Sequence, residues 1–117
     1  MHDSIYQLCV YFPLEEPASL QALQAFKEAL FGAGAGRLGN YQRCCWQTRG
    51  SGQFEAMSGA NPTLGQPGEV TEVEEVKLEL FVPSDARVAV ERALRSAHPY
   101  EEPAYFFFIA DTQGSAE

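Results

Sequence analysis

The sequence predicts an α+β domain in which a four-stranded antiparallel sheet carries two helices on one face. Residues 4–12 alternate between two faces with strand periodicity, and residues 70–82 contain a second long stretch of this kind. Residues 17–31 and 84–97 place apolar side chains at helical spacing. The 117 residues are 45% hydrophobic, which suits one domain with its core at about 4–110 and a polar tail at 111–117.

The first half begins with a strand and a helix. Between Ser4 and Phe12, β-branched and aromatic residues alternate with period two, so we expect a strand there. A helix should follow from Pro17 to Phe31, because proline is tolerated in the first helical turn. Gly32 suits the left-handed residue that commonly ends a helix.

The middle of the chain predicts an extra β-hairpin. After the glycine-dense residues 32–39, Tyr41 to Thr48 has the composition of a strand. Gly50-Ser51-Gly52 then resembles a turn, with a short returning strand at 53–57. Residues 58–68 contain glycine, proline and asparagine and are expected to form a loop.

The second half repeats the order strand, helix, strand. The strand at 70–82 changes the parity of its apolar residues, which a bulge near Glu74-Glu75 would explain. Ser84 is a candidate cap for the second helix, and Pro99 requires that helix to end at Ala97 or His98. The last strand, 104–110, is apolar or aromatic at nearly every position.

This order of elements is a split βαβ repeat, and a ferredoxin-like sandwich is its commonest fold. Two helices cover only one face of such a sheet, yet the last strand is apolar on both faces. We therefore expect the chain to cover the open face by self-association. The alternative is that the hairpin at 41–57 folds back over that face.

Charge and composition exclude several partners. The net charge of −8 argues against nucleic acids and anionic membranes, which attract clusters of Lys and Arg. The sequence has no signal-peptide pattern and no apolar stretch of membrane-spanning length, so we expect a cytoplasmic protein. Three cysteines, two of them adjacent, form no disulfide or zinc pattern.

A glycine motif, Gly34-x-Gly36-x-x-Gly39, matches the dinucleotide-binding pattern as a string of letters. That pattern must follow a strand and open a helix, whose N-terminal N–H groups hold the pyrophosphate. Here it follows a helix and precedes a strand. We therefore interpret it as a tight connection between the two.

The segment from His98 to Pro103 carries the densest group of functional side chains. An imidazole, a phenol and two carboxylates lie between two prolines on a short connection. A histidine with carboxylates can bind a divalent metal or transfer protons near neutral pH, and one of Cys44 and Cys45, which should point to opposite faces of a strand, could join it as a ligand. The alternative is structural, with His98 ending the helix and Tyr100 packing under the connection.

Several motifs together resemble the domain inserted in YqfO proteins of the Nif-three-like family. The resemblance covers about residues 5–109 and rests on these motifs: Gly32-Ala-Gly34, Gly39-Asn40-Tyr41, Cys44, Gly50-Ser-Gly52-Gln-Phe54, Pro62-x-x-Gly65-x-x-Gly68, Glu74-Glu75-Val76 and Ala97-His98-Pro99-Tyr100-Glu101-Glu102. The chain is similar to the small standalone members. CutA proteins share the pattern at His98 to Pro103.

The resemblance implies a ferredoxin-like fold of the CutA and PII type and a homo-oligomer, with a trimer expected. It implies a sensor or regulatory module without a firm cofactor, with a divalent metal or a small ligand as the candidate. The candidate ligand-binding residues are His98, Tyr100, Glu101, Tyr41, Cys44 and Trp46, and the candidate metal ligands are His98, Glu101 and Glu102.

Two alternatives to the sensor stay open. One is a ligand-free structural or protein-interaction oligomer. The other is a small enzyme with a site between subunits that uses His98 as acid or base. The di-metal hydrolase domains of the long family members have no counterpart in this sequence, so we predict no catalytic residues.

Overall fold

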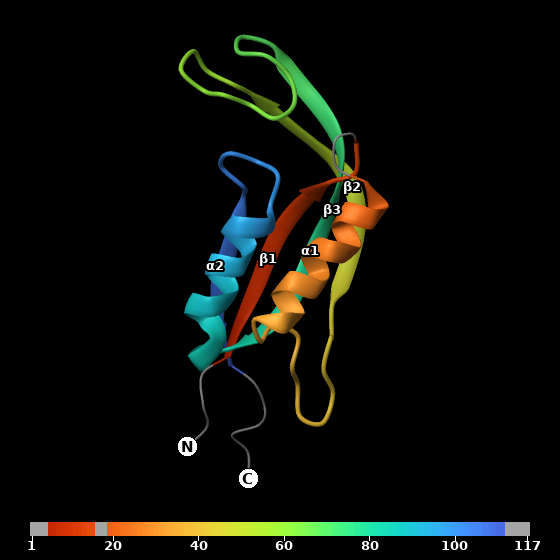
Figure 1. Cartoon of the computed structure of the whole chain (residues 1–117), viewed down its shortest axis with the longest axis vertical. Helices are drawn as coiled ribbons and strands as arrows, with labels where there is room; N and C mark the ends of the chain where they lie inside the picture. Colours follow the sequence, from red (N-terminus) through yellow and green to blue (C-terminus); the bar gives the residue numbers. More distant parts are fainter. Residues whose placement is uncertain (1–4, 16–18, 112–117) are drawn as a thin grey trace.

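A computed structural model describes residues 5–15 and 19–111 and confirms the predicted fold class. The four strands form one antiparallel sheet in the order β2-β3-β1-β4, and both helices lie on the same side of it (Figure 1). The elements are β1 (Ile5–Pro13), α1 (Leu20–Gly32), β2 (Trp46–Glu55), β3 (Val70–Pro83), a 3₁₀ turn (Ser84–Ala86), α2 (Arg87–Ala97) and β4 (Tyr105–Ala110).

The core lies between the central strands and the two helices. Alternate side chains of β1 and β3 point toward the helices, because successive residues of a strand face opposite sides. They meet the apolar stripes of α1 and α2 and form a contiguous buried cluster. Its members include Leu8, Val10, Phe12, Leu23, Phe26, Leu30, Val76, Leu78, Leu80, Val82, Val90 and Leu94. Burying each such side chain stabilises the fold by about 1.5–3 kcal/mol.

The helix ends agree only in part with the sequence-based expectation. The expected start of the first helix, Pro17, lies outside the described residues, and Ser19 caps α1 by accepting the N–H of Ala22. Gly32 belongs to the helix without a left-handed φ. Ser84 begins a 3₁₀ turn and makes no side-chain cap, because that turn precedes α2. The predicted end of the second helix at Ala97 is confirmed.

The glycine-rich connection between α1 and β2 is a tight turn, as interpreted from the sequence. Gly34 and Gly36 have φ values of 118° and 85°, a region that side chains strongly disfavour. The N–H of Gly36 donates to the carbonyl oxygen of Phe81, and its own carbonyl accepts the N–H of Cys44. The motif thus ties a helix end to a strand and opens no helix of its own.

The predicted hairpin within residues 41–57 is wrong. Tyr41 makes only an isolated bridge with Leu38, and β2 begins at Trp46 rather than at Tyr41. It then runs without interruption through Gly50-Ser51-Gly52 to Glu55 and pairs along its whole length with β3. Gly50-Ser51-Gly52 has the composition of a turn, but it lies within a strand because β3, with 14 residues, offers a partner to every residue of β2. The reversal lies in residues 56–69.

The bulge expected near Glu74-Glu75 is also wrong, because the register of β3 is continuous against both neighbours. The parity of its buried residues changes because β3 outruns β1, whose last residue, Pro13, pairs with Glu75. Beyond that point β2 and β3 pair only with each other. We call residues 51–74 the arm, which curls over the connection between α2 and β4 (Figure 1).

Neither helix in the described part of the chain is long and apolar enough to cross a membrane.

Candidate functional site

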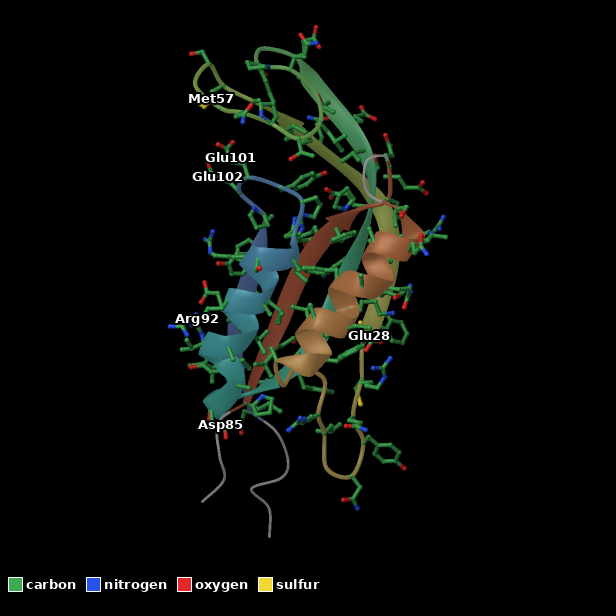
Figure 2. The ribbon with its side chains drawn as sticks, viewed as in Figure 1. Glu28, Met57, Asp85, Arg92, Glu101 and Glu102 are labelled. Atoms are coloured by element: carbon green, nitrogen blue, oxygen red, sulfur yellow. The ribbon has the colours of Figure 1, made fainter. Side chains whose placement is uncertain are left out.

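A cavity of about 420 Å³ lies between the arm and residues 98–104, which we call the α2–β4 connection. Its volume is in the range of small-molecule sites. Glu101 and Glu102 lie on the connection and face the arm, which carries Met57 at its far end (Figure 2). We call this space the arm cavity. Its lining comes from β1, β2, β3, the 56–69 loop and the connection, and includes Tyr11, Phe54, Leu64, Glu75, Tyr100 and Glu101.

His98 anchors the connection but does not face the arm cavity. Its side chain is buried, with 7% exposed, and lies edge-on to the rings of Phe12 and Phe26. Nε2 lies 2.6 Å from the carbonyl oxygen of Tyr11, which can only accept, so Nε2 carries the proton. Nδ1 accepts the N–H of Tyr100 at 3.1 Å. Both nitrogens of the neutral ring are therefore used.

Burial lowers the pKa of His98 below its ordinary value of 6.5, although the bond to Tyr11 acts in the opposite direction. The ring therefore stays neutral at physiological pH. A neutral imidazole with both nitrogens bonded has no lone pair for a metal and no free position for proton transfer. This geometry supports the structural interpretation of His98 over the metal and acid–base interpretations.

Tyr100 and Glu75 meet on the wall of the arm cavity. The Tyr100 hydroxyl donates to Oε2 of Glu75 at 3.4 Å, and the rings of Tyr100 and Phe54 lie edge to face with their centroids 6.2 Å apart. Burial raises the pKa of the Glu75 carboxyl, and the bond from Tyr100 partly offsets it. Burial, together with the charge of Glu75, also raises the pKa of Tyr100, so its phenol stays protonated.

Gly52 gives the Glu75 carboxylate its place in the cavity wall. A Cβ atom at Gly52 would collide with the carboxyl group of Glu75, which lies across the opposite strand of the arm. The carboxylate therefore rests against bare backbone. A glycine in this strand thus shapes the wall of the arm cavity rather than a turn.

Two hydrogen bonds fasten the connection to the arm loop. Oε1 of Glu101 accepts the N–H of Asn61 at 3.2 Å, and the hydroxyl of Thr63 donates to the carbonyl oxygen of Pro99 at 2.7 Å. These contacts hold the far ends of the cavity together. Movement of the arm would break both of them.

The described residues show no metal centre. Among them, no group of three or more His, Cys, Asp or Glu side chains is arranged to hold a metal ion. His98 is turned into the core, whereas Glu101 and Glu102 are exposed and line the arm cavity. The donor set expected for a divalent metal therefore does not converge, and we derive no metal chemistry from it.

The other candidate residues lie away from the arm cavity. Tyr41 is 75% exposed in the α1–β2 connection, at the end of the sheet opposite the arm. Cys44 and Trp46 border a shallow hollow on the face of the sheet that the helices leave open, together with Gln7 and Glu79. The structure thus separates the two parts of the predicted site.

The open face presents a row of side chains across all four strands, with exposed aromatic residues on the two edge strands, β2 and β4, which we call the aromatic row. Trp46 pairs with Glu79, Glu79 with Cys9, and Cys9 with Phe106, so these side chains share one face. Trp46, Phe106 and Phe108 are 69%, 55% and 53% exposed. The predicted bare face is confirmed, and no other element within residues 5–15 and 19–111 covers these aromatic side chains.

Two of the three thiols are poor nucleophiles. Burial raises the pKa of Cys9 and of Cys45, which keeps both as neutral thiols. Cys45 contacts the backbone of Trp46 through its sulfur.

Sequence reasoning missed Glu75, Phe54 and Tyr11 as parts of a site. Glu75 stood within a run of acidic residues that resembled an ordinary solvated strand face. The available signal was that the apolar residues of β3 switch from one face of the strand to the other next to Glu75. This switch marks where β3 extends beyond the core and its other face gains neighbours.

Comparisons with known proteins agree with this geometry. No protein-family model matches the chain. The chain is 43% identical over 105 residues to a "GTP cyclohydrolase 1 type 2 homolog" of Mycobacterium leprae and 40% identical over 103 residues to that of Bacillus subtilis. These matches cover 90% and 88% of this chain and 26% of each relative. The chain spans about a quarter of the length of these curated relatives.

Solved structures give the same result. A Bacillus cereus protein related to NIF3 matches 94% of this chain and 26% of its own, with a TM-score of 0.76 and 31% identity. The divalent ion tolerance protein CutA1 of Ehrlichia chaffeensis matches 98% of this chain and 89% of its own, with a TM-score of 0.65 and 12% identity. The second match shows a shared fold alone. The chain is thus a homologue of one CutA-like segment of the NIF3 (YqfO) family proteins, as its motifs had indicated.

Proposed function

We propose that this chain is a non-catalytic module that binds a small ligand in the arm cavity and self-associates through the open face of its sheet. The arm cavity is the observation that carries the proposal. It has the volume of a ligand site, apolar walls and a few convergent polar groups, which is the usual composition of such sites. The activity in the names of the longer relatives is not extended to this chain, which spans only a quarter of them.

The ligand part of the proposal rests on how the cavity is built. Its floor and one wall are strands of the sheet, and the two hydrogen bonds at Asn61 and Thr63 hold the opposite wall. Because the walls are already in place, binding costs little ordering of the chain. The polar groups of Glu75 and Tyr100 would orient a ligand whose remainder contacts apolar residues.

The self-association part rests on the aromatic row at Trp46, Phe106 and Phe108. Exposed aromatic side chains on an uncovered sheet face are typical of interfaces between subunits. Neighbouring copies in an assembly would cover these side chains. We propose three copies, as the resemblance to CutA and PII proteins implies, and a cytoplasmic location, as the sequence suggests.

A titration with two small aromatic probes, 2-phenylethylamine and 2-phenylethanol, tests the ligand part. We expect shifts of the backbone amide signals of Phe54, Ala60 and Tyr100 in ¹⁵N spectra. Ala60→Phe fills the cavity and should abolish these shifts, whereas Met57→Phe lies on the same loop outside the lining and should keep them. If neither probe moves these signals in the intact protein, the arm cavity is not a ligand site.

A further inference from the structure

The arm cavity has an uncompensated negative charge. Among the described residues, three carboxylates line it, those of Glu75, Glu101 and Glu102, and no lysine or arginine does. Within residues 5–15 and 19–111, none of the three forms an ion pair. By contrast, Glu74, next to Glu75 but outside the lining, is paired with Arg49. The cavity is therefore a place where the chain leaves carboxylates without a cation.

Glu75 is the carboxylate that this arrangement affects most. It is half-buried, and its only hydrogen-bond donor within the described ranges is the Tyr100 hydroxyl. Burial raises its pKa, which shows that the negative charge is poorly solvated there. A positively charged group at this point would replace the lost hydration and gain a charge-assisted hydrogen bond.

Aromatic rings lie beside this carboxylate. The rings of Phe54 and Tyr100 meet at 61°, and Tyr11 completes this side of the cavity. The face of an aromatic ring carries negative electrostatic potential and attracts organic cations. Carboxylate and ring faces together therefore favour a cation whose charge is spread over an ammonium or guanidinium group.

The rest of the lining is apolar and comes from the arm loop. Ala56, Ala60, Pro62 and Leu64 supply this wall opposite the connection. A fully hydrated inorganic ion would gain nothing from these side chains. An organic cation with a short hydrocarbon body would bury that body against them.

We propose that the arm cavity binds a small organic cation, an amine or guanidine with an apolar body, with its charged end at Glu75 between Phe54 and Tyr100. This inference rests on the proposed function, since it names the class of ligand for the same cavity. An anionic ligand is disfavoured there because all three charged groups of the lining repel it.

The test compares three probes of nearly equal shape and different charge. These are 2-phenylethylamine, protonated at pH 7, the neutral 2-phenylethanol, and the anion 3-phenylpropionate. Each is titrated into the full chain and its dissociation constant is taken from the ¹⁵N shifts of Phe54, Ala60 and Tyr100. We expect the amine to bind at least about tenfold tighter than the alcohol, and the anion to bind weakest.

Two variants locate the charge preference. Glu75→Gln keeps the size of the side chain and should weaken the amine about tenfold while leaving the alcohol unchanged. Glu72→Gln removes an exposed carboxylate from the same strand outside the lining and should change neither. The ¹⁵N spectra of both variants without probe should match the wild-type spectrum, which establishes that they fold.

Three results would overturn the inference. Equal binding of amine and alcohol at the cavity would remove the cation preference but leave the proposed function in place. If Glu75→Gln and Glu72→Gln weaken binding of the amine equally, only the overall negative charge of the protein matters for that binding. Binding of no probe would remove the inference and the proposed function together.

Discussion

The imidazole of His98 donates through Nε2 to the carbonyl oxygen of Tyr11 at 2.6 Å, and this bond joins the end of α2 to the end of β1. The ring contacts Phe12 and Phe26 while its second nitrogen accepts the N–H of Tyr100. The residue that stood out chemically in the sequence is therefore a structural anchor. It positions Tyr100, which does line the arm cavity.

His98 should titrate below 6.5. Burial disfavours its charged form, and a proton on Nδ1 would break the bond from Tyr100. The ring signals of His98, followed by NMR in a His2→Ala background with one histidine, should give a pKa below that ordinary value. A pKa at or above 6.5 would contradict the neutral, doubly bonded ring.

The lowered pKa of His98 also makes the stability of the fold depend on pH. The unfolded chain takes up the proton near pH 6.5, whereas the folded chain does so only at lower pH. This contribution to stability is complete above pH 6.5 and is lost as pH falls through the folded pKa, by at most about 1.4 kcal/mol per pH unit. Urea unfolding at several pH values measures it, and His98→Gln should lack this contribution.

His98→Ala should destabilise the fold strongly. It leaves the Tyr11 carbonyl unpaired and opens a cavity beside Phe12 and Phe26, at a cost of about 2–4 kcal/mol. Arg92→Ala, an exposed position on α2 (Figure 2), is the matched control and should change the free energy of unfolding by less than about 0.5 kcal/mol. Equal effects in chemical denaturation would refute the anchoring role.

Tyr100→Phe should raise the pKa of Glu75. The Tyr100 hydroxyl stabilises the ionised carboxylate, and its removal leaves only the effect of burial. A ¹³C titration of the Glu75 carboxyl carbon measures the change. Tyr41→Phe, at an exposed site at the other end of the sheet, should leave that pKa unchanged. An unchanged value in Tyr100→Phe would show that the hydrogen bond does not form in solution.

Gly36→Ala should cost about 2 kcal/mol or more. Its φ of 85° strains any side chain, and a Cβ atom would lie 2.9 Å from the backbone oxygen of Cys44. Gly32→Ala, at a helical site where a Cβ meets no atom within 4 Å, should be neutral or stabilising. Unfolding by urea distinguishes the two. A harmless Gly36→Ala would contradict the tight connection.

Phe106→Glu should weaken self-association. The substitution places a charge in the aromatic row of the open face, which a neighbouring copy would have to desolvate. Val88→Glu is the matched control, because Val88 is 59% exposed on the helical side of the domain. Light scattering after size exclusion should show a smaller species for Phe106→Glu alone. Equal masses for both variants would place the interface elsewhere.

The sequence predicted those elements whose periodicity reports burial against the two helices. The positions of β1 and α2 follow from residues such as Leu8 and Val90, which recur with a single period, and the position of β4 follows from its unbroken apolar run. The path of β2 could not be predicted in this way, because its pairing with β3 along its whole length sets that path, rather than a pattern within β2 itself.

The arm cavity could be predicted only in part for the same reason. Tyr100 and Glu101 were found because they cluster in the sequence beside His98. Phe54 and Glu75 are brought to them by the curl of the arm, and Gly52 matters only because Glu75 lies over it. Contacts between residues far apart in the sequence leave little trace in local periodicity.

Native mass spectrometry of the untagged chain tests the central claim most directly, because it reports the number of subunits and any bound mass together. The proposed function predicts an assembly of three copies that gains one 2-phenylethylamine per subunit, and loses that gain in Ala60→Phe but not in Met57→Phe. A monomer at micromolar concentration, or an assembly whose mass the probe does not change, would contradict it.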